Sequence, residues 1–199
     1  MKKYSAGIVS RPTLMRESII IASLMNQGLD GKDIKHKIIE ENYLKLSSLR
    51  RKKEISSTIC SRLKELDANE INILVEGSME EKKQMVLVSI LKYDRLFMEF
   101  ILEVYLEKIN IAQLDLKESD FNSFFRRKAE QSEIVAKWKV KTVGKVKQLY
   151  KKILTELGFI KSNGKEYEIV IPIVSESFKS AISNESAEIK KLFTRGQGI

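Results

Sequence analysis

Proline occurs at only two positions, Pro12 and Pro172, and this distribution constrains the fold more than any other feature of the sequence. The 159 residues between them contain no residue that lacks a backbone N–H, and such a stretch favours helices. Of the 199 residues, 43% are hydrophobic, which is enough to bury a core in one domain or in two small ones. We therefore predict an all-α, multi-helical globular bundle rather than a disordered chain.

Glycines, capping side chains and apolar periodicity predict where individual helices begin and end. Ser47 is expected to cap the third helix. Asp67 with Glu70, and Ser78 with Glu81, have the spacing of capping boxes at two further helix starts. The predicted helices cover residues 13–27, 30–41, 47–66, 67–76, 79–92, 94–110, 119–133, 134–157, 175–183 and 184–193.

One stretch, residues 159–173, has a different pattern. Ser162, Asn163 and Gly164 are typical of a turn, and β-branched residues are frequent from Tyr167 to Ile173. This pattern predicts at most a small β-hairpin within an otherwise helical protein.

Positive charge is concentrated in two stretches. The formal net charge is +9 at pH 7, from 36 Lys and Arg against 27 Asp and Glu. Residues 1–62 carry +7 and residues 123–165 carry +9, whereas residues 63–122 carry −6 and residues 166–199 carry −1. We expect three successive segments, packed as one compact unit or as two subdomains: a basic, helix-turn-helix-like segment (1–66), an acidic and apolar helical core (67–133), and a basic segment with a long helix and a possible wing (134–199).

Residues that could carry catalysis or bind a metal are scarce. Cys60 is the only cysteine and His36 the only histidine, which disfavours a disulfide framework, a Cys/His metal site and a His-dependent catalytic triad. Glu118 and Asp120 lie at an expected helix start, where acids stabilise the helix dipole. The sequence therefore predicts a protein that is not an enzyme and has no cofactor or metal.

The apolar runs are short. They fall far below the roughly 18 residues that are needed to span a bilayer, and no apolar signal segment follows the N-terminal lysines. We therefore expect a cytoplasmic protein that does not contact membranes. We also expect it to be a monomer.

The predicted helix 134–157 separates apolar and charged residues onto opposite faces. At roughly 100° per residue, Val146, Tyr150 and Ile153 share the face expected to be buried. A basic helix followed by a possible hairpin has the order of a winged helix-turn-helix recognition helix and its wing. The alternative is a solvated, lysine-rich helix of a bundle. The candidate DNA-binding residues of this helix are Lys139, Lys141, Lys145, Lys147, Gln148, Lys151 and Lys152.

Two other basic clusters are candidate DNA contacts. The first turn of the third helix contains Arg50, Arg51, Lys52 and Lys53. Four cations at a helix N-terminus oppose the dipole, so phosphate contact would explain them better than local helix stability. A solvated face is the alternative. The second cluster is Arg126 and Arg127, followed by Lys128, near a helix C-terminus, where cations are favourable without any ligand.

Segments in order along the chain carry a family resemblance. They are Tyr4-Ser5-Ala6-Gly7; Lys92 to Phe100 with Glu103 and Lys108; Asn122 to Ser132 with Trp138; and Tyr150, Leu154, Gly158 and Phe159. At this chain length, they resemble the BrxA family of bacterial BREX phage-resistance systems. The motifs are not catalytic signatures, so the resemblance rests on their collinearity over nearly the whole chain.

The resemblance implies a small, non-enzymatic BREX component, associated with DNA binding, whose all-helical fold is related in shape to the antitermination factor NusB. A fully helical fold would have loops or helix in place of the hairpin. Together with the charge pattern, this predicts an accessory protein that contacts double-stranded DNA mainly through phosphates, alongside other BREX proteins. About five phosphate contacts would give a slope of about −4 to −5 for log K against log salt. The alternative is a protein–protein adaptor of the BREX complex whose affinity for DNA or RNA is incidental.

Overall fold

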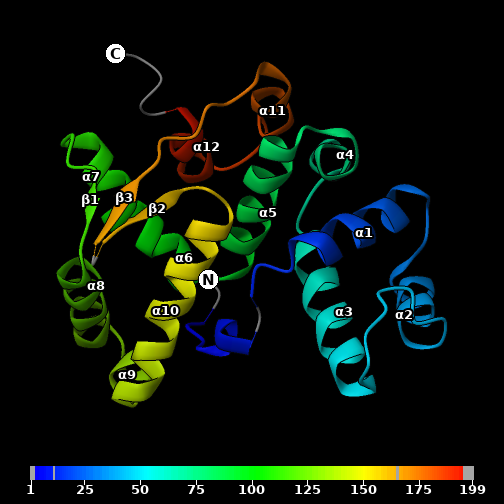
Figure 1. Cartoon of the computed structure of the whole chain (residues 1–199), viewed down its shortest axis with the longest axis horizontal. Coiled ribbons are helices and arrows are strands. Elements are labelled where there is room, and N and C mark those ends of the chain that lie inside the picture. The colour runs from blue at the N-terminus through cyan, green and yellow to red at the C-terminus, as the bar shows by residue number, and fades with distance from the viewer. Residues whose placement is uncertain (1–2, 11, 165, 195–199) are drawn as a thin grey trace. The chain divides into compact units, whose positions relative to one another are not determined.

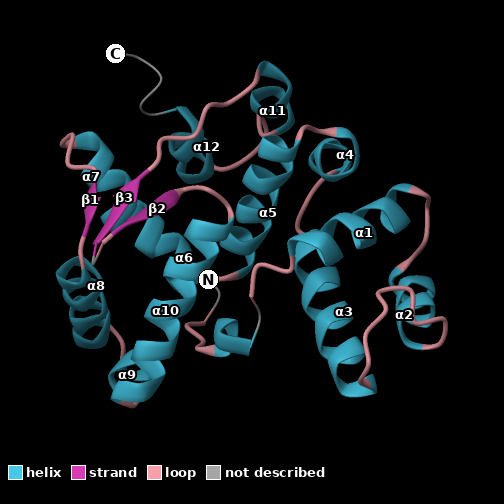
Figure 2. Cartoon of the chain, viewed as in Figure 1, coloured by secondary structure: helices cyan, strands magenta, loops and turns pink. Residues whose placement is uncertain are grey.

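Helices dominate the computed structural model, which describes residues 3–10, 12–164 and 166–194 (Figure 1). A small three-stranded β-sheet is also present among these residues (Figure 2). The predicted helical fold class is therefore confirmed. The chain divides into two units, each of which combines parts of all three segments expected from the charge pattern. Unit 1 consists of Met1–Pro12, Asp94–Ser175 and Ser183–Ile199, and unit 2 consists of Thr13–Tyr93 and Glu176–Ile182.

Capping side chains determine where several helices of unit 2 begin. The Asp30 carboxylate accepts hydrogen bonds from two first-turn amides at 2.7 and 2.9 Å. Asp67 and Glu70 form the predicted capping box. Ser78 and Glu81 form the other, with bonds of 2.6 and 3.2 Å. The helices of unit 2 are α1 (Met15–Asn26), α2 (Gly31–Ile39), α3 (Leu49–Leu63), α4 (Ala68–Glu76), α5 (Met79–Tyr93) and α11 (Glu176–Ala181).

The predicted ends of the third helix are wrong. Ser48, not Ser47, is the N-cap of α3, because the backbone is extended at Ser48 and its Oγ accepts a hydrogen bond from Arg51 N–H at 3.2 Å. The helix ends at Leu63 rather than at residue 66. The following residues tighten into i→i−3 turns before the extended backbone of Asp67, which caps α4.

Helix α5 lies at the centre of unit 2. Met85, Val86, Leu87 and Val88 are consecutive and fully buried, so this part of the helix is covered on all sides. Helices α1, α3 and α4 pack against it.

In unit 1, the backbone hydrogen bonds change from the α-helical to the π-helical pattern in the middle of the predicted helix 94–110. The stretch consists of α6 (Arg95–Phe100), the π-helical turn η2 (Ile101–Tyr105) and α7 (Leu106–Asn110). The wider π turn ends at Tyr105, whose buried hydroxyl lies 2.7 Å from Val170 O and 3.1 Å from Phe159 O. Burial raises the pKa of this hydroxyl, which therefore stays a hydrogen-bond donor.

The hairpin predicted within residues 159–173 is present and belongs to the three-stranded sheet. Strand β2 (Ile160–Asn163) pairs antiparallel with β3 (Glu166–Ile169), which also pairs antiparallel with β1 (Asp115–Leu116). The expectation that loops or helix replace the hairpin is therefore wrong. A strand of two residues such as β1 is too short to show alternation in the sequence, and it was not predicted.

Aromatic side chains form the core of unit 1. The Tyr150 ring centroid lies 4.4 Å from that of Phe97, 5.4 Å from that of Phe100 and 5.9 Å from that of Phe125. Phe97 and Phe100 are fully buried, so they are core residues rather than platforms for bases. The remaining elements of unit 1 are the 3₁₀ turn η1 (Gly7–Ser10), α8 (Glu118–Gln131), α9 (Glu133–Ala136), α10 (Val140–Glu156) and α12 (Ala187–Thr194).

The two adjacent serines before α3 provide a test of the observed cap. We expect Ser48→Ala to lower the free energy of unfolding by about 1 kcal/mol, because the Arg51 amide loses its acceptor. Ser47→Ala removes a hydroxyl group one residue earlier and should have little effect on the free energy of unfolding. Urea denaturation followed by circular dichroism measures both, and equal effects of the two variants would contradict the assignment of the cap.

Candidate nucleic-acid interface

The basic helix predicted over residues 134–157 is two helices, α9 and α10. The chain is extended at Lys139 (φ −65°, ψ 148°), which is the N-cap of α10. Val135 of α9 is buried, with 2% of its surface exposed, and α9 packs on α8. No proline or glycine marks the interruption, so the pattern alone indicated a continuous helix.

The two faces predicted for this helix are confirmed on α10. Val146, Tyr150 and Ile153 are fully buried. Lys141, Lys145, Gln148 and Lys152 are exposed on the opposite face.

Glu118 of α8 forms ion pairs with two lysines of α10 that are candidates for DNA contact. Lys147 Nζ lies 2.6 Å from Glu118 Oε1, and Lys151 pairs with the other carboxylate oxygen. Burial raises the pKa of Glu118, but hydrogen bonds from the two lysines outweigh it and hold the pKa below its usual value. The sequence alone indicates Glu118 only as a helix-start acid, because its partners lie 29 and 33 residues away in the sequence.

Three lysines therefore remain available at the N-terminal part of α10. Lys152 forms an i,i+4 pair with Glu156 at 3.6 Å. Lys139, Lys141 and Lys145 form no ion pair within the described ranges. The first turn of α10 has no acidic residue, and no side chain caps it, so its amides and its dipole add to the positive potential.

The four cations of α3 differ in their surroundings. Arg50 pairs with Glu54 at 2.8 Å, and Lys52 donates a hydrogen bond to Ile39 O at 3.1 Å. Arg51 and Lys53 are exposed and have no ion pair in the part of the chain that the structure describes. The connection from α2 to α3 spans residues 40–48, longer than the turn of roughly three to four residues in a helix-turn-helix.

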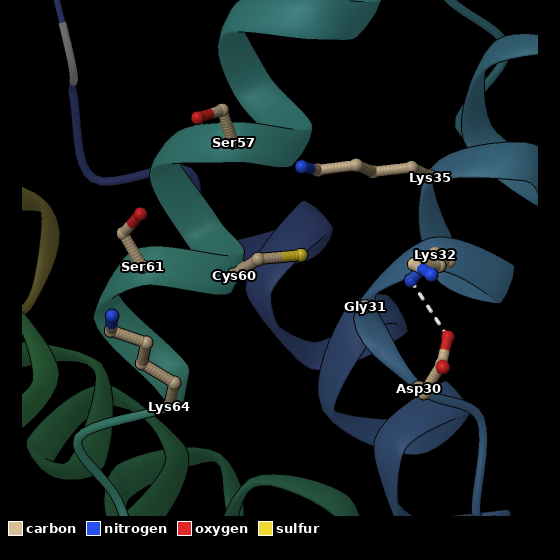
Figure 3. Close-up of a pocket in the computed structure, with 8 residues that line it drawn as sticks. All are labelled: Asp30, Gly31, Lys32, Lys35, Ser57, Cys60, Ser61 and Lys64. Atoms are coloured by element: carbon tan, nitrogen blue, oxygen red, sulfur yellow. Dashed lines mark hydrogen bonds between the residues drawn. The ribbon is translucent and has the colours of Figure 1, made fainter.

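A pocket opens between α2 and α3 (Figure 3). Its volume is about 330 Å³, and Lys32, Lys35, Cys60 and Lys64 are among its lining residues. The sequence did not indicate this pocket, because it requires that two helices with separate periodicities lie side by side.

The cations at the end of α8 also differ from one another. Arg126 is exposed and has no ion pair among the described residues. Arg127 lies 3.8 Å from Glu103, and Lys128 is buried, with 4% of its side chain exposed. Arg126 is therefore the available cation of this cluster.

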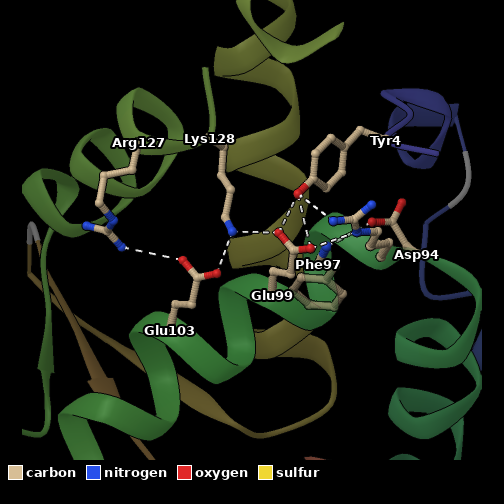
Figure 4. Close-up of polar contacts among 8 residues, drawn as sticks. Tyr4, Asp94, Phe97, Glu99, Glu103, Arg127 and Lys128 are labelled. Atoms are coloured by element: carbon tan, nitrogen blue, oxygen red, sulfur yellow. Dashed lines mark hydrogen bonds and ion pairs between the residues drawn. The ribbon is translucent and has the colours of Figure 1, made fainter. Parts of the chain in front are cut away.

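Lys128 belongs to a polar network, here called the Glu99 network, that joins the N-terminal segment to α6 and α8 (Figure 4). Tyr4 Oη donates to Glu99 Oε2 at 2.8 Å, and Arg95 Nε donates to Glu99 Oε1 at 2.7 Å. Lys128 Nζ lies 2.6 Å from Glu99 and also contacts Glu103. All five residues lie in the segments that carry the family resemblance.

Charges are stabilised within the Glu99 network. Burial raises the pKa of Glu99, but hydrogen bonds from Lys128, Arg95 and Tyr4 hold it below its usual value. Burial lowers the pKa of Lys128, but hydrogen bonds to Glu103 and Glu99 outweigh this and raise it. Both groups are therefore charged at neutral pH, as a buried ion pair requires.

The described residues contain no group of three or more His, Cys, Asp and Glu side chains that could hold a metal ion. His36 has 66% of its side chain exposed, and its Nδ1 lies 3.7 Å from Glu41. Within the same ranges, every helix is too short or too polar to span a bilayer.

Known sequences resemble this chain over most of its length. The family model BrxA matches residues 2–186. The BREX protein BrxA of Bacillus cereus (strain H3081.97) is 41% identical over 172 residues, which is 86% of each chain. The BREX protein BrxA of Escherichia coli O9:H4 (strain HS) is 24% identical over 159 residues, covering 80% of this chain and 75% of that protein.

A crystal structure shows the same fold. It is that of an uncharacterized protein from Magnetospirillum magneticum, which matches with a TM-score of 0.80 and 22% sequence identity. The match covers 96% of this chain and 98% of that one.

We expect the Glu99 network to stabilise the folded protein. Lys128→Met keeps the aliphatic part of the side chain but leaves Glu99 and Glu103 without their ammonium partner. We expect a loss of about 2 kcal/mol, less than for a fully buried pair, because Arg95 and Tyr4 still contact Glu99.

Lys161→Met is the matched control. It breaks an exposed ion pair of 3.1 Å with Glu168 in the same unit, for which we expect at most about 0.5 kcal/mol. Urea denaturation measures both variants, and a Lys128→Met effect no larger than that of the control would disprove the structural role of the network.

Proposed function

The chain belongs to the BrxA family and is thus a component of a BREX phage-defence system, and from this premise we propose that it is a non-enzymatic accessory protein that contacts double-stranded DNA mainly through phosphates. The proposed contacts are the cations that protein acids leave unpaired. The observation that carries the proposal is the N-terminal part of α10, where three lysines without ion pairs meet an uncapped helix end.

The geometry at α10 suits a row of phosphates. Lys141 and Lys145 lie one turn apart on the exposed face, and Gln148 follows them. Lys139 precedes the first turn, where amide groups also attract anions. Ammonium groups and helix ends bind the DNA backbone without reading sequence, whereas the Gln148 amide could hydrogen bond to a phosphate or to a base edge.

Arg51 and Lys53 of α3 are a second proposed contact. Arg51 lies in the first turn of α3 and Lys53 directly follows that turn. Positive charge this close to a helix N-terminus opposes the helix dipole, so neither cation stabilises α3 locally. Ser48 already caps this helix, and a phosphate would therefore be held by the two side chains. Arg126 at the end of α8 is a third proposed contact, although a helix C-terminus is a favourable place for a cation without any ligand.

Salt dependence tests the proposed contact at α10. Replacing Lys139, Lys141 and Lys145 by Gln should weaken duplex binding and make the slope of log K against log salt about 2.7 less negative, since each lost phosphate contact removes about 0.9. Fluorescence anisotropy with a labelled duplex, from low to physiological salt, gives the slope for each variant.

A variant of equal charge provides the control. Replacing Lys117, Lys161 and Lys191 by Gln also removes three positive charges from unit 1 but alters none of the proposed contacts. Its slope should stay close to that of the unaltered protein. The proposal fails if the two triple variants have the same slope, or if the unaltered protein binds no duplex at low salt.

Exposed apolar side chains favour a second candidate function, a protein–protein adaptor. Val140, at the start of α10, is 90% exposed, and Ile134 of α9 is 44% exposed. A partner protein would cover such residues, because burying apolar surface stabilises a complex.

The adaptor function predicts that Val140→Ser weakens the association with other BREX proteins by about tenfold. Ile111→Ser is the control, because it alters another exposed apolar side chain, of which 54% is accessible. Co-purification after nuclease treatment measures both. Association that is lost with nuclease and unchanged by Val140→Ser would exclude the adaptor function at this surface.

A further inference from the structure

The pocket between α2 and α3 gathers positive charge from both helices. Lys32 and Lys35 come from α2, and Lys64 follows the last residue of α3. All three are exposed and form no ion pair within the described residues. Three lysines without acidic partners in the described part of the chain therefore line one hollow, and an anion in it would be attracted by their positive charge.

The single carboxylate that lines the pocket does not neutralise these lysines. Asp30 accepts hydrogen bonds from the backbone amides of Asp33 and Lys32, and these lower its pKa. The Asp30 carboxylate therefore interacts with the N-terminus of α2, and the pocket keeps a surplus of positive charge. Because Asp30 already occupies the helix end, an anion in the pocket would be held by side chains.

Hydroxyl groups extend the polar lining along α3. Ser57 and Ser61 lie one turn apart and line the pocket. At roughly 100° per residue, Lys53, Ser57 and Lys64 fall within about 40° of arc, so they share one face of the helix. Figure 3 shows Lys35 and Cys60 extending into the space between the two helices, with the serines along α3.

We propose that this pocket binds a phosphate group. Lysine ammonium groups form charge-assisted hydrogen bonds to phosphate oxygens, and the serine hydroxyls can donate further ones. The phosphate belongs either to the backbone of duplex DNA or to a free phosphate ion. In the first case the inference deepens the proposed function and rests on it, whereas in the second it stands alone.

Cys60 reports on this pocket alone, because it is the only cysteine of the chain and it lines the pocket. Its side chain is half-buried, and burial raises the pKa of its thiol, although the charge of Lys35 opposes this shift. A bound phosphate should block a neutral maleimide from reaching the sulfur. The labelling rate of the full chain then falls by the factor 1 + [L]/Kd, about tenfold at a ligand concentration of about nine times Kd.

The experiment measures Cys60 labelling at fixed pH and ionic strength with inorganic phosphate, with a short duplex, and with chloride as the reference. Protection by phosphate and by the duplex, or by the duplex alone, identifies a backbone phosphate. Protection by inorganic phosphate alone identifies a free phosphate ion. The inference is overturned if neither slows labelling relative to chloride.

Paired variants show whether the lysines cause the protection. The double variant Lys35→Gln with Lys64→Gln should bind the protecting ligand at least about tenfold more weakly, because two charge-assisted hydrogen bonds are lost. Lys45→Gln with Lys82→Gln removes the same charge from unit 2 without altering the pocket and should leave protection unchanged. Equal protection in both double variants would also overturn the inference.

The outcome is separable from that of the proposed function. A duplex that binds with the expected salt slope but, like phosphate, leaves Cys60 labelling unchanged overturns the phosphate pocket and leaves the proposed function standing. Protection by inorganic phosphate in a protein that binds no duplex supports the phosphate pocket and contradicts the proposed function.

Discussion

The aromatic packing around Tyr150 fixes the orientation of α10, and the exposure of its lysines depends on this packing. Tyr150 is fully buried between rings of α6 and α8, so α10 cannot rotate about its axis without opening the core. Glu118 holds the flank of the helix through Lys147 and Lys151. What remains in contact with solvent is the face that carries Lys141 and Lys145.

Acidic residues from the middle of the sequence form ion pairs with several of the lysines that follow them. Glu118 pairs with two lysines of α10, and Glu99 and Glu103 enclose Lys128. The charge of +9 on residues 123–165 therefore overstates the charge available to a ligand. A cation that is already paired has little electrostatic energy to gain from a phosphate, so the unpaired ones define the proposed interface.

Much of the fold could be predicted because its signals are local. The capping boxes at Asp67 and Ser78 join residues three apart, and their chemistry can be read without any tertiary contact. The turn at Asn163 and Gly164 likewise indicated the β2–β3 hairpin, whereas the two residues of β1 carry no pattern of their own. The prediction for Ser47 was wrong by one residue, because both serines can cap and the backbone selects Ser48.

The sequence by itself determined which face of α10 is buried, because the helical period places Val146, Tyr150 and Ile153 on one side. It also showed where positive charge is concentrated and that few residues could carry catalysis. Only the tertiary structure decided which cations remain unpaired, and it alone brought α2 and α3 together around a pocket. The physical reason is distance along the chain: the partners of Lys128, Lys147 and Lys151 lie 25 to 33 residues away, and only packing of the helices brings them within hydrogen-bonding range.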